Sequence, residues 1–191
     1  MKKIKSFLLF FLFINCLEKE LIILDQSDLN LKTENGILNY FDKPFSGKIV
    51  SFYSSKQKRV DINYLNGRKN GNEKKWYKSG EIASERNYLN NFKIGVHKGY
   101  WENGKKKFLY HFNFKGEYMG TVEEWYNSGN KYRFFNYING KEVGNQKLWH
   151  ETGAVKANYD VVDGERYGLI GLKNCFKVNN GQIVKWNEWL V

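Results

Sequence analysis

Residues 71–91 have the sequence GNEKKWYKSGEIASERNYLNN, which contains the pattern that predicts the fold. The same pattern returns at residues 120–140 as GTVEEWYNSGNKYRFFNYING. Each stretch starts with a glycine, continues with Trp-Tyr and a second glycine, and ends with a Tyr, one aliphatic residue and Asn-Asn or Asn-Gly. This regularity predicts tandem repeats, which decide the architecture of any chain that contains them.

The repeat has a period of about 24 residues and extends over most of the chain. Its first glycine recurs as Gly71, Gly95, Gly120 and Gly144, with spacings of 24, 25 and 24. Five residues after these glycines lie Trp76, Tyr100, Trp125 and Trp149. Nine residues after them lie Gly80, Gly104, Gly129 and Gly153. So many matched positions define a repeat unit.

The sequence of each repeat unit predicts that the unit contains two strands and two turns. Asn-Gly pairs such as Asn66-Gly67 tolerate positive φ and favour a tight hairpin between two extended runs. The glycine four residues further on, Gly71, allows a β-bulge. In residues 59–64, Val, Ile and Tyr alternate with Arg, Asp and Asn, which is typical of a strand with one buried and one wet face.

The sequence therefore predicts an all-β fold, an elongated antiparallel β-meander of stacked hairpins. Since Trp76, Tyr100, Trp125 and Trp149 share one repeat position, we expect them to pack in the core. We expect a repeat domain over residues 36–170, a linker and N-terminal cap over 17–35, and a C-terminal cap over 171–191. Residues 21–30 lack glycine, which favours a linker or a short helix, and Trp186 and Trp189 would close the sheet.

The motif of glycine, four residues, Trp-Tyr, two residues and glycine resembles the variant MORN repeat of bacterial antitoxins of the YwqK family. Gly71, Trp76, Tyr77 and Gly80 fit it fully, as do Gly120, Trp125, Tyr126 and Gly129. Gly144, Trp149 and Gly153 fit with His150 at the Tyr position, and Gly95 and Gly104 fit with Tyr100-Trp101 inverted. The resemblance implies a meander of hairpins and neutralisation of a toxin by binding; related eukaryotic repeats are linked with membrane attachment and scaffolding.

The first sixteen residues read as a targeting segment. Lysines at 2, 3 and 5 precede the apolar run FLLFFLFI of residues 7–14, which is too short to cross a bilayer and typical of a signal peptide. Cys16 follows directly, as in a bacterial lipobox, although Asn15 stands where a small residue is usual. We expect residues 1–16 to be a signal peptide with lipidation at Cys16. Ordinary secretion, an uncleaved anchor or a cytosolic chain remain alternatives.

The chain is basic, with a formal net charge of +11, and without the three N-terminal lysines 28 basic face 20 acidic side chains. This favours an acidic protein, anionic lipid or nucleic acid as partner, or else a solvated lysine-rich surface. We expect the solvated surface, since the lysines recur in every repeat. We do not expect nucleic acid as a partner, because an exported chain rarely meets it.

Residues that could carry chemistry do not form a recognisable motif. His97, His111 and His150 form no metal-binding pair in sequence, and Cys175 has no neighbouring His or Asp. Glutamates such as Glu73 and Glu124 recur on the repeat surface, but a one-layer sheet offers no deep cleft to bring a catalytic pair together. The sequence thus predicts no enzyme, no cofactor and no metal site.

These features together predict a non-enzymatic repeat protein that binds an unidentified protein at the bacterial cell envelope, lipid-anchored through Cys16 or secreted. A cytosolic antitoxin-like inhibitor of a toxin protein is one alternative. A binder of anionic lipid surfaces, using exposed lysines and aromatic side chains, is another.

Overall fold

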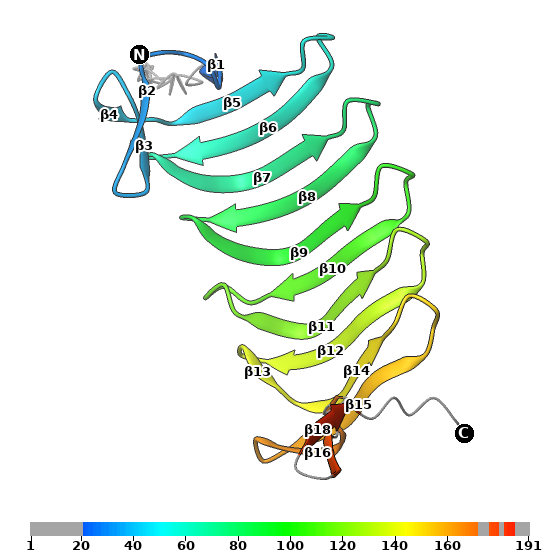
Figure 1. Cartoon of the computed structure of the whole chain (residues 1–191). Coiled ribbons are helices and arrows are strands. Elements are labelled where there is room, and N and C mark those ends of the chain that lie inside the picture. The colour runs from blue at the N-terminus through cyan, green and yellow to red at the C-terminus, as the bar shows by residue number, and fades with distance from the viewer. Residues whose placement is uncertain (1–20, 172–175, 180–181, 186–191) are drawn as a thin grey trace, which may run out of the picture.

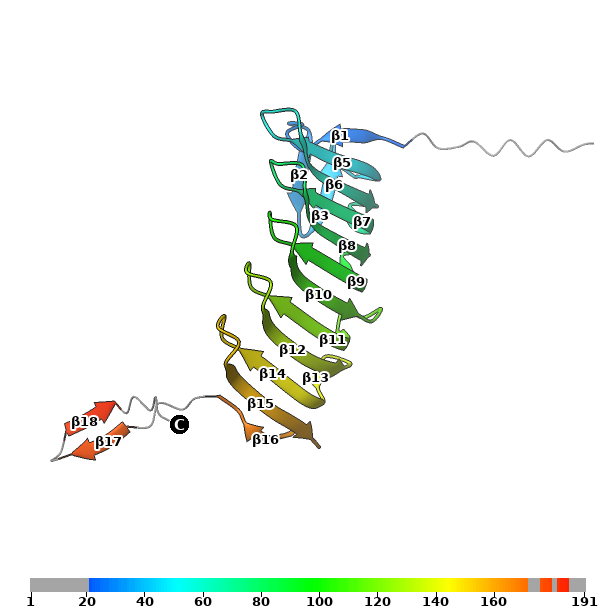
Figure 2. The same ribbon diagram turned by 90° about the vertical axis from the view of Figure 1, so that its right-hand side faces the viewer.

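A computed structural model describes residues 21–171, 176–179 and 182–185, and within these ranges all regular structure is β-strand. No helix in this part of the chain is long and apolar enough to cross a membrane. The main body is a 13-stranded sheet, and from residue 47 onward its strands lie next to one another in the order of the sequence. Figures 1 and 2 show a single elongated layer of strands, with hairpin turns along both edges.

Eleven strands of this sheet form the antiparallel meander, which confirms the predicted fold class. They are β5 (Gly47–Phe52), β6 (Lys58–Leu65), β7 (Arg68–Trp76), β8 (Ile82–Leu89), β9 (Phe92–Tyr100), β10 (Lys106–Phe112), β11 (Tyr118–Trp125), β12 (Lys131–Ile138), β14 (Gly144–Trp149), β15 (Val155–Val162) and β16 (Glu165–Leu169). The short β13 (Lys141–Glu142) pairs with the end of β12.

One edge of the sheet carries the tight turns predicted from Asn-Gly. Asn66 and Gly67 have φ of 49° and 73°, and Leu65 pairs with Arg68 directly across the turn. Two consecutive positive φ angles define the type I′ turn, whose twist matches that of the flanking strands. Gly67 also lies against the N-terminal hairpin, since a Cβ there would come within 2.3 Å of Ile37 Cγ2.

The opposite edge carries longer turns that follow the Trp-Tyr pair. The amide of Tyr77 donates to the carbonyl of Glu81, and the amide of Gly80 donates to the carbonyl of Tyr77. Gly80 has φ of 97°, so the loop is a three-residue turn that ends in a left-handed glycine. The same two backbone hydrogen bonds recur in the turns that begin at Trp101, Tyr126 and His150. These turns end at Gly104, Gly129 and Gly153, respectively.

The first glycine of each repeat lies in a β-bulge, as the sequence predicts. Ile62 pairs with Glu73 while Tyr64 pairs with Lys69, so residues 70–72 bulge opposite Asn63. The Asn63 side chain donates to the carbonyl of Asn72 at 3.1 Å and closes the bulge. Equivalent irregularities contain Gly95, Gly120 and Gly144.

Residues 21–30 differ from the prediction. Residues 23–25 form β1 (Ile23–Asp25), which pairs in parallel with residues 48–50 of β5, so neither a linker nor a short helix occupies this position. The difference arises because the outer edge of β5 needs backbone partners, and β1 supplies them. Three short strands, β2 (Leu31–Glu34), β3 (Ile37–Tyr40) and β4 (Lys43–Pro44), form a separate sheet. The expected boundary between residues 35 and 36 falls inside the β2–β3 turn.

The C-terminal end of the sheet is β16, and its residues 165–169 are all exposed. Strands β17 (Phe176–Asn179) and β18 (Gln182–Lys185) pair with each other in a two-stranded sheet of their own. Trp186 and Trp189, which we expected to close the main sheet, lie outside the described residues.

Alternating side chains divide the main sheet into two faces. The tyrosine face carries a row of paired residues that includes Ile62, Glu73, Arg86, His97, Tyr110, Val122 and Phe135. The tryptophan face carries the opposite row of Lys74, Glu85, Lys98, Leu109, Glu123, Phe134 and Lys147. The buried side chains of β5–β16 all lie on the tyrosine face; they are Ile49, Ser51, Ile62, Glu73, Ser84, Tyr88, His97, Phe112, Val122, Phe135, Gln146, Ala157, Tyr159 and Val161.

Candidate functional site

The tyrosine face carries a continuous row of aromatic rings. Tyr110 meets Tyr118 at 5.7 Å between ring centroids, Phe112 stacks on Tyr118 at 4.8 Å, and Tyr118 meets Tyr137 at 5.1 Å. The rings come from β10, β11 and β12, whose antiparallel register brings successive repeats side by side. Tyr110, Tyr118 and Tyr137 are only half-buried, so the row is both packed and accessible.

Cationic side chains lie over this row. The Lys69 ammonium lies 4.9 Å from the centroid of the Tyr88 ring, and the Arg86 guanidinium lies 5.6 Å from that of Phe108. Similar pairs form between Lys93 and Phe112, Arg133 and Phe135, and Arg166 and Tyr159. Such contacts contribute about 0.5–1 kcal/mol at exposed sites, and they fix the position of long flexible side chains.

Glutamates neutralise some of these cations. Glu124 accepts hydrogen bonds from Tyr110 and Arg133, and Glu142 accepts from Tyr159 at 3.2 Å and from Arg166 at 2.9 Å. Burial, followed by the hydrogen bond to Glu124 and its negative charge, raises the pKa of Tyr110. In each of these two clusters one carboxylate faces one cation, so the cluster is balanced in charge.

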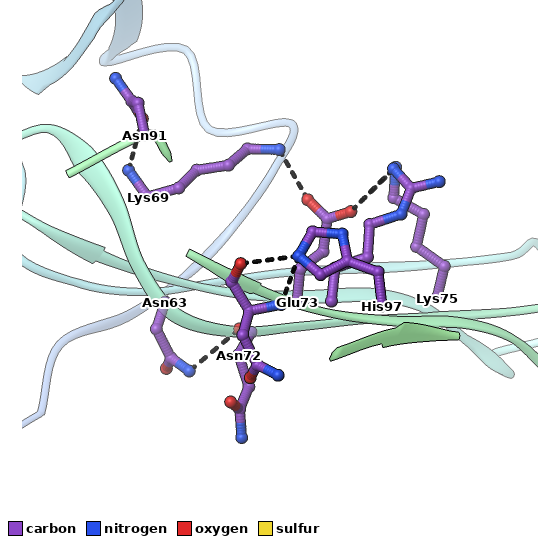
Figure 3. Close-up of polar contacts among 9 residues, drawn as sticks. Asn63, Lys69, Asn72, Glu73, Lys75, Asn91 and His97 are labelled. Carbon is purple, nitrogen blue, oxygen red and sulfur yellow. Dashed lines mark hydrogen bonds and ion pairs between the residues drawn. The ribbon is translucent and has the colours of Figure 1, made fainter. Parts of the chain in front are cut away.

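The cluster around Glu73 is different, and Figure 3 shows it together with the neighbouring His97. The Glu73 side chain is fully buried, and three cations surround it. Lys69 Nζ lies 2.6 Å from Oε2, while Lys75 Nζ and Arg86 Nη1 lie 3.4 and 3.7 Å from Oε1. Among the described residues, Oε1 accepts no hydrogen bond.

These cations keep Glu73 ionised. Burial alone would raise the pKa of Glu73, but the Lys69 hydrogen bond and the charges of Lys69, Lys75 and Arg86 hold that pKa below its usual value. Burial would likewise lower the pKa of Lys69, and the Glu73 carboxylate holds it above its usual value. The cluster therefore carries three positive charges and one negative charge at neutral pH.

His97 and Gln146 occupy the same repeat position as Glu73 and are also buried. His97 Nε2 lies 3.2 Å from the amide nitrogen and 2.8 Å from the carbonyl oxygen of Asn87. Gln146 bonds to the amide and the carbonyl of Asn136 at 2.9 and 3.1 Å. Gln146 therefore satisfies both backbone groups left free by its bulge, through two different atoms. His97 Nε2 satisfies one of the two Asn87 groups at a time, because a ring nitrogen either donates or accepts a hydrogen bond.

The other two histidines also replace repeat residues. His111 takes the place of the repeat Asn, and its Nδ1 lies 3.0 Å from the carbonyl of Thr121. His150 takes the place of the repeat Tyr and is exposed. In the described ranges, no three His, Cys, Asp or Glu residues converge in a way that could hold a metal. Cys16 and Cys175 lie outside the described residues.

The repeat aromatic residues lie elsewhere than we expected. Trp76, Tyr100, Trp125 and Trp149 are half-buried on the tryptophan face, so the prediction that they form the core is wrong. Their position ends the first strand of each repeat, where only flanking side chains cover the rings. Lysines do so at Trp76 and Trp125, whose centroids lie 5.5 Å from Lys58 Nζ and Lys106 Nζ.

The residue after each of these aromatics links one repeat to the next. Tyr77 OH donates to the carbonyl of Tyr100 at 2.8 Å, and Tyr126 OH donates to that of Trp149 at 2.9 Å. In the inverted Tyr100-Trp101 pair, the indole nitrogen of Trp101 makes the same link by donating to the carbonyl of Trp125 at 3.0 Å. The Trp-Tyr motif thus holds neighbouring repeats in register, which explains its recurrence without a binding role.

Comparison with known proteins adds little to this geometry. No protein-family model matches the chain, and no curated protein matches it. One solved structure that does match is that of a S. aureus TarM mutant in complex with Fondaparinux, alpha-GlcNAc-glycerol and UDP. It is 14% identical with a TM-score of 0.30, and the match covers 60% of this chain and 21% of that one. So distant a likeness, to about a fifth of a longer protein, carries no argument about fold or function.

Proposed function

We propose that the chain is a non-enzymatic repeat protein that binds another protein at the bacterial envelope, where a lipid on Cys16 attaches it. The observation that carries this proposal is the accessible row of Tyr, Phe, Lys and Arg side chains on the tyrosine face. Tyr and Arg are enriched at the centres of protein interfaces, because each combines a large contact area with a polar end.

The rigidity of the scaffold supports the same proposal. Every repeat is tied to its neighbours by strand pairing and by side-chain bonds such as Tyr77 to Tyr100 and Tyr126 to Trp149. Side chains that are already held in place lose less conformational entropy when a partner binds. The resemblance of the repeat to variant MORN repeats also favours binding over catalysis.

Photo-cross-linking in the native host tests the binding face. p-Benzoylphenylalanine would replace Tyr118 or Tyr137 on the tyrosine face and, as matched controls, Leu109 or Phe134 on the tryptophan face; all four positions are half-buried. We expect one discrete protein adduct from the first pair and none from the second. Adducts from the control positions alone would contradict the proposed face.

Fractionation and intact mass of the wild type and a Cys16→Ala variant test the location. We expect diacylglycerol mass and membrane association in the wild type only. An uncut, unlipidated, soluble wild-type chain would contradict envelope attachment and would favour an antitoxin-like inhibitor in the cytosol. Adducts with lipid in place of protein would favour a binder of anionic lipid surfaces.

A further inference from the structure

The Glu73 cluster has more positive charge than it needs to stabilise its buried carboxylate. Lys69, Lys75 and Arg86 all lie within 4 Å of Glu73, while Glu124 and Glu142 each have one ion-pair partner in the described part of the chain. Removing one cation from a balanced pair would leave a carboxylate uncompensated. Here Lys69 alone makes the short contact of 2.6 Å, so Lys75 and Arg86 retain charge that an external anion can use.

The cations are also reachable from solvent. Their side chains are 30%, 40% and 32% exposed for Lys69, Lys75 and Arg86, while that of Glu73 is 0% exposed. An anion that approaches the tyrosine face therefore meets the cations before it meets the carboxylate. Glu73 holds them at fixed positions from below, so they need little reorganisation when a ligand arrives.

Aromatic rings flank the cluster and narrow the class of ligand. Lys69 lies over the buried Tyr88 ring and Arg86 lies over the half-buried Phe108 ring, so apolar ring surface adjoins the positive charge. A ligand that fits both features carries carboxylates next to apolar or aromatic side chains. An acidic protein segment with interspersed apolar residues has this composition.

We propose that the Lys69–Lys75–Arg86 cluster is an anion-binding site that receives a carboxylate from an acidic, partly apolar segment of the partner protein. This proposal rests on the proposed function, since it names the chemistry of the partner that the tyrosine face binds. The buried Glu73 serves as the fixed base of the site and does not contact the ligand.

Two neighbouring lysines allow a matched test. Lys75 and Lys74 are consecutive residues of β7 with side chains 40% and 44% exposed, and they point to opposite faces. The probe is fluorescein-labelled random copolymer of glutamate and tyrosine, titrated with the full chain at low and at high salt. Parallel titrations use phosphatidylglycerol vesicles and a single-stranded oligonucleotide. Thermal melting of each variant checks that it folds.

We expect Lys75→Gln or Arg86→Gln to weaken copolymer binding about fivefold each, and the double variant roughly 20-fold. Lys74→Gln should change the affinity less than twofold, and high salt should weaken binding by the wild type.

Three results would overturn the proposal. They are equal weakening by Lys74→Gln and Lys75→Gln, no binding of the copolymer by the wild type, and Lys75-dependent binding confined to the vesicles or the oligonucleotide. If any of these occurred while Tyr118 still cross-linked to a protein, the proposed function would stand and only the anion site would fail.

Discussion

The two faces of this one-layer sheet share strands, turns and a similar mixture of lysines and aromatic rings. They differ in how tightly these side chains pack. On the tyrosine face, rings, cations and buried polar groups pack on one another, and Val122 and Ala157 are fully buried. On the tryptophan face, ion pairs such as Lys74–Glu85 at 3.0 Å join partly exposed side chains across strands. Composition alone therefore does not distinguish a core from a solvated face; the position within the repeat does.

The largest expected difference between the faces concerns two adjacent phenylalanines of β12. Phe135 is 8% exposed on the tyrosine face, and Phe134 is half-buried on the tryptophan face. We expect Phe135→Ala to lower the free energy of unfolding by about 3 kcal/mol and Phe134→Ala by about 1 kcal/mol. Urea denaturation of the full chain measures both. Equal losses would show that both faces contribute equally to the core.

A smaller effect is expected at the buried polar position of the tyrosine face. Gln146→Ala leaves the amide and carbonyl of Asn136 without their side-chain partner, which costs about 2 kcal/mol. His97→Gln should retain most of the stability, because Gln146 already satisfies the equivalent groups in another repeat. Denaturant unfolding of the two variants compares them directly. A His97→Gln loss as large as that of Gln146→Ala would contradict this equivalence.

The hydrogen bond that links neighbouring repeats at the Trp-Tyr turns should contribute less to the free energy of unfolding. Tyr126→Phe removes the hydrogen bond to the carbonyl of Trp149 and keeps the ring, so we expect a loss of about 1 kcal/mol. Hydrogen exchange should locate the loss in β11–β15 and leave β5–β7 unchanged, because repeats interact only with their neighbours. Uniform loosening of the whole sheet would instead indicate one indivisible cooperative unit.

The smallest effect is a pH dependence confined to the tyrosine face. Burial lowers the pKa of His97 below its usual value of 6.5, so the unfolded chain binds a proton more readily than the folded one. The contribution of His97 to stability is therefore present above pH 6.5 and is lost as the pH falls below it. The difference in unfolding free energy between wild type and His97→Gln, followed from pH 7.5 to 5, should reveal this slope. Parallel curves would contradict it.

The sequence predicted the meander, the two kinds of turn and the bulges because each depends on local residue types. Asn66-Gly67 specifies its turn whatever surrounds it, and Tyr77 and Gly80 specify theirs. The sequence-based prediction failed for Trp76, because a hydrophobic residue that recurs at one repeat position can lie at a strand end, with a lysine over its ring, as well as in the core. It also failed for β1, whose strand exists only through pairing with residues 48–50.

The Glu73 cluster could not have been found from sequence spacing alone. Lys75 and Arg86 reach the same carboxylate because residue 73 lies directly opposite residue 86 across β7 and β8. The sequence contained one usable signal, namely a charged residue at a repeat position that holds Ile49 and Val122 in other units. A charge at a core position indicates either a compensating partner or a functional site, and here three cations supply the compensation.

Lysine footprinting with an acetylating reagent, in the presence and absence of the partner isolated by cross-linking, shows which face the partner covers. If the tyrosine face is the binding face, Lys75 and Lys93 become protected in the complex while Lys74 and Lys98 react as they do in the free chain. Protection of Lys74 and Lys98 with no change at Lys75 and Lys93 would show instead that the partner binds the tryptophan face.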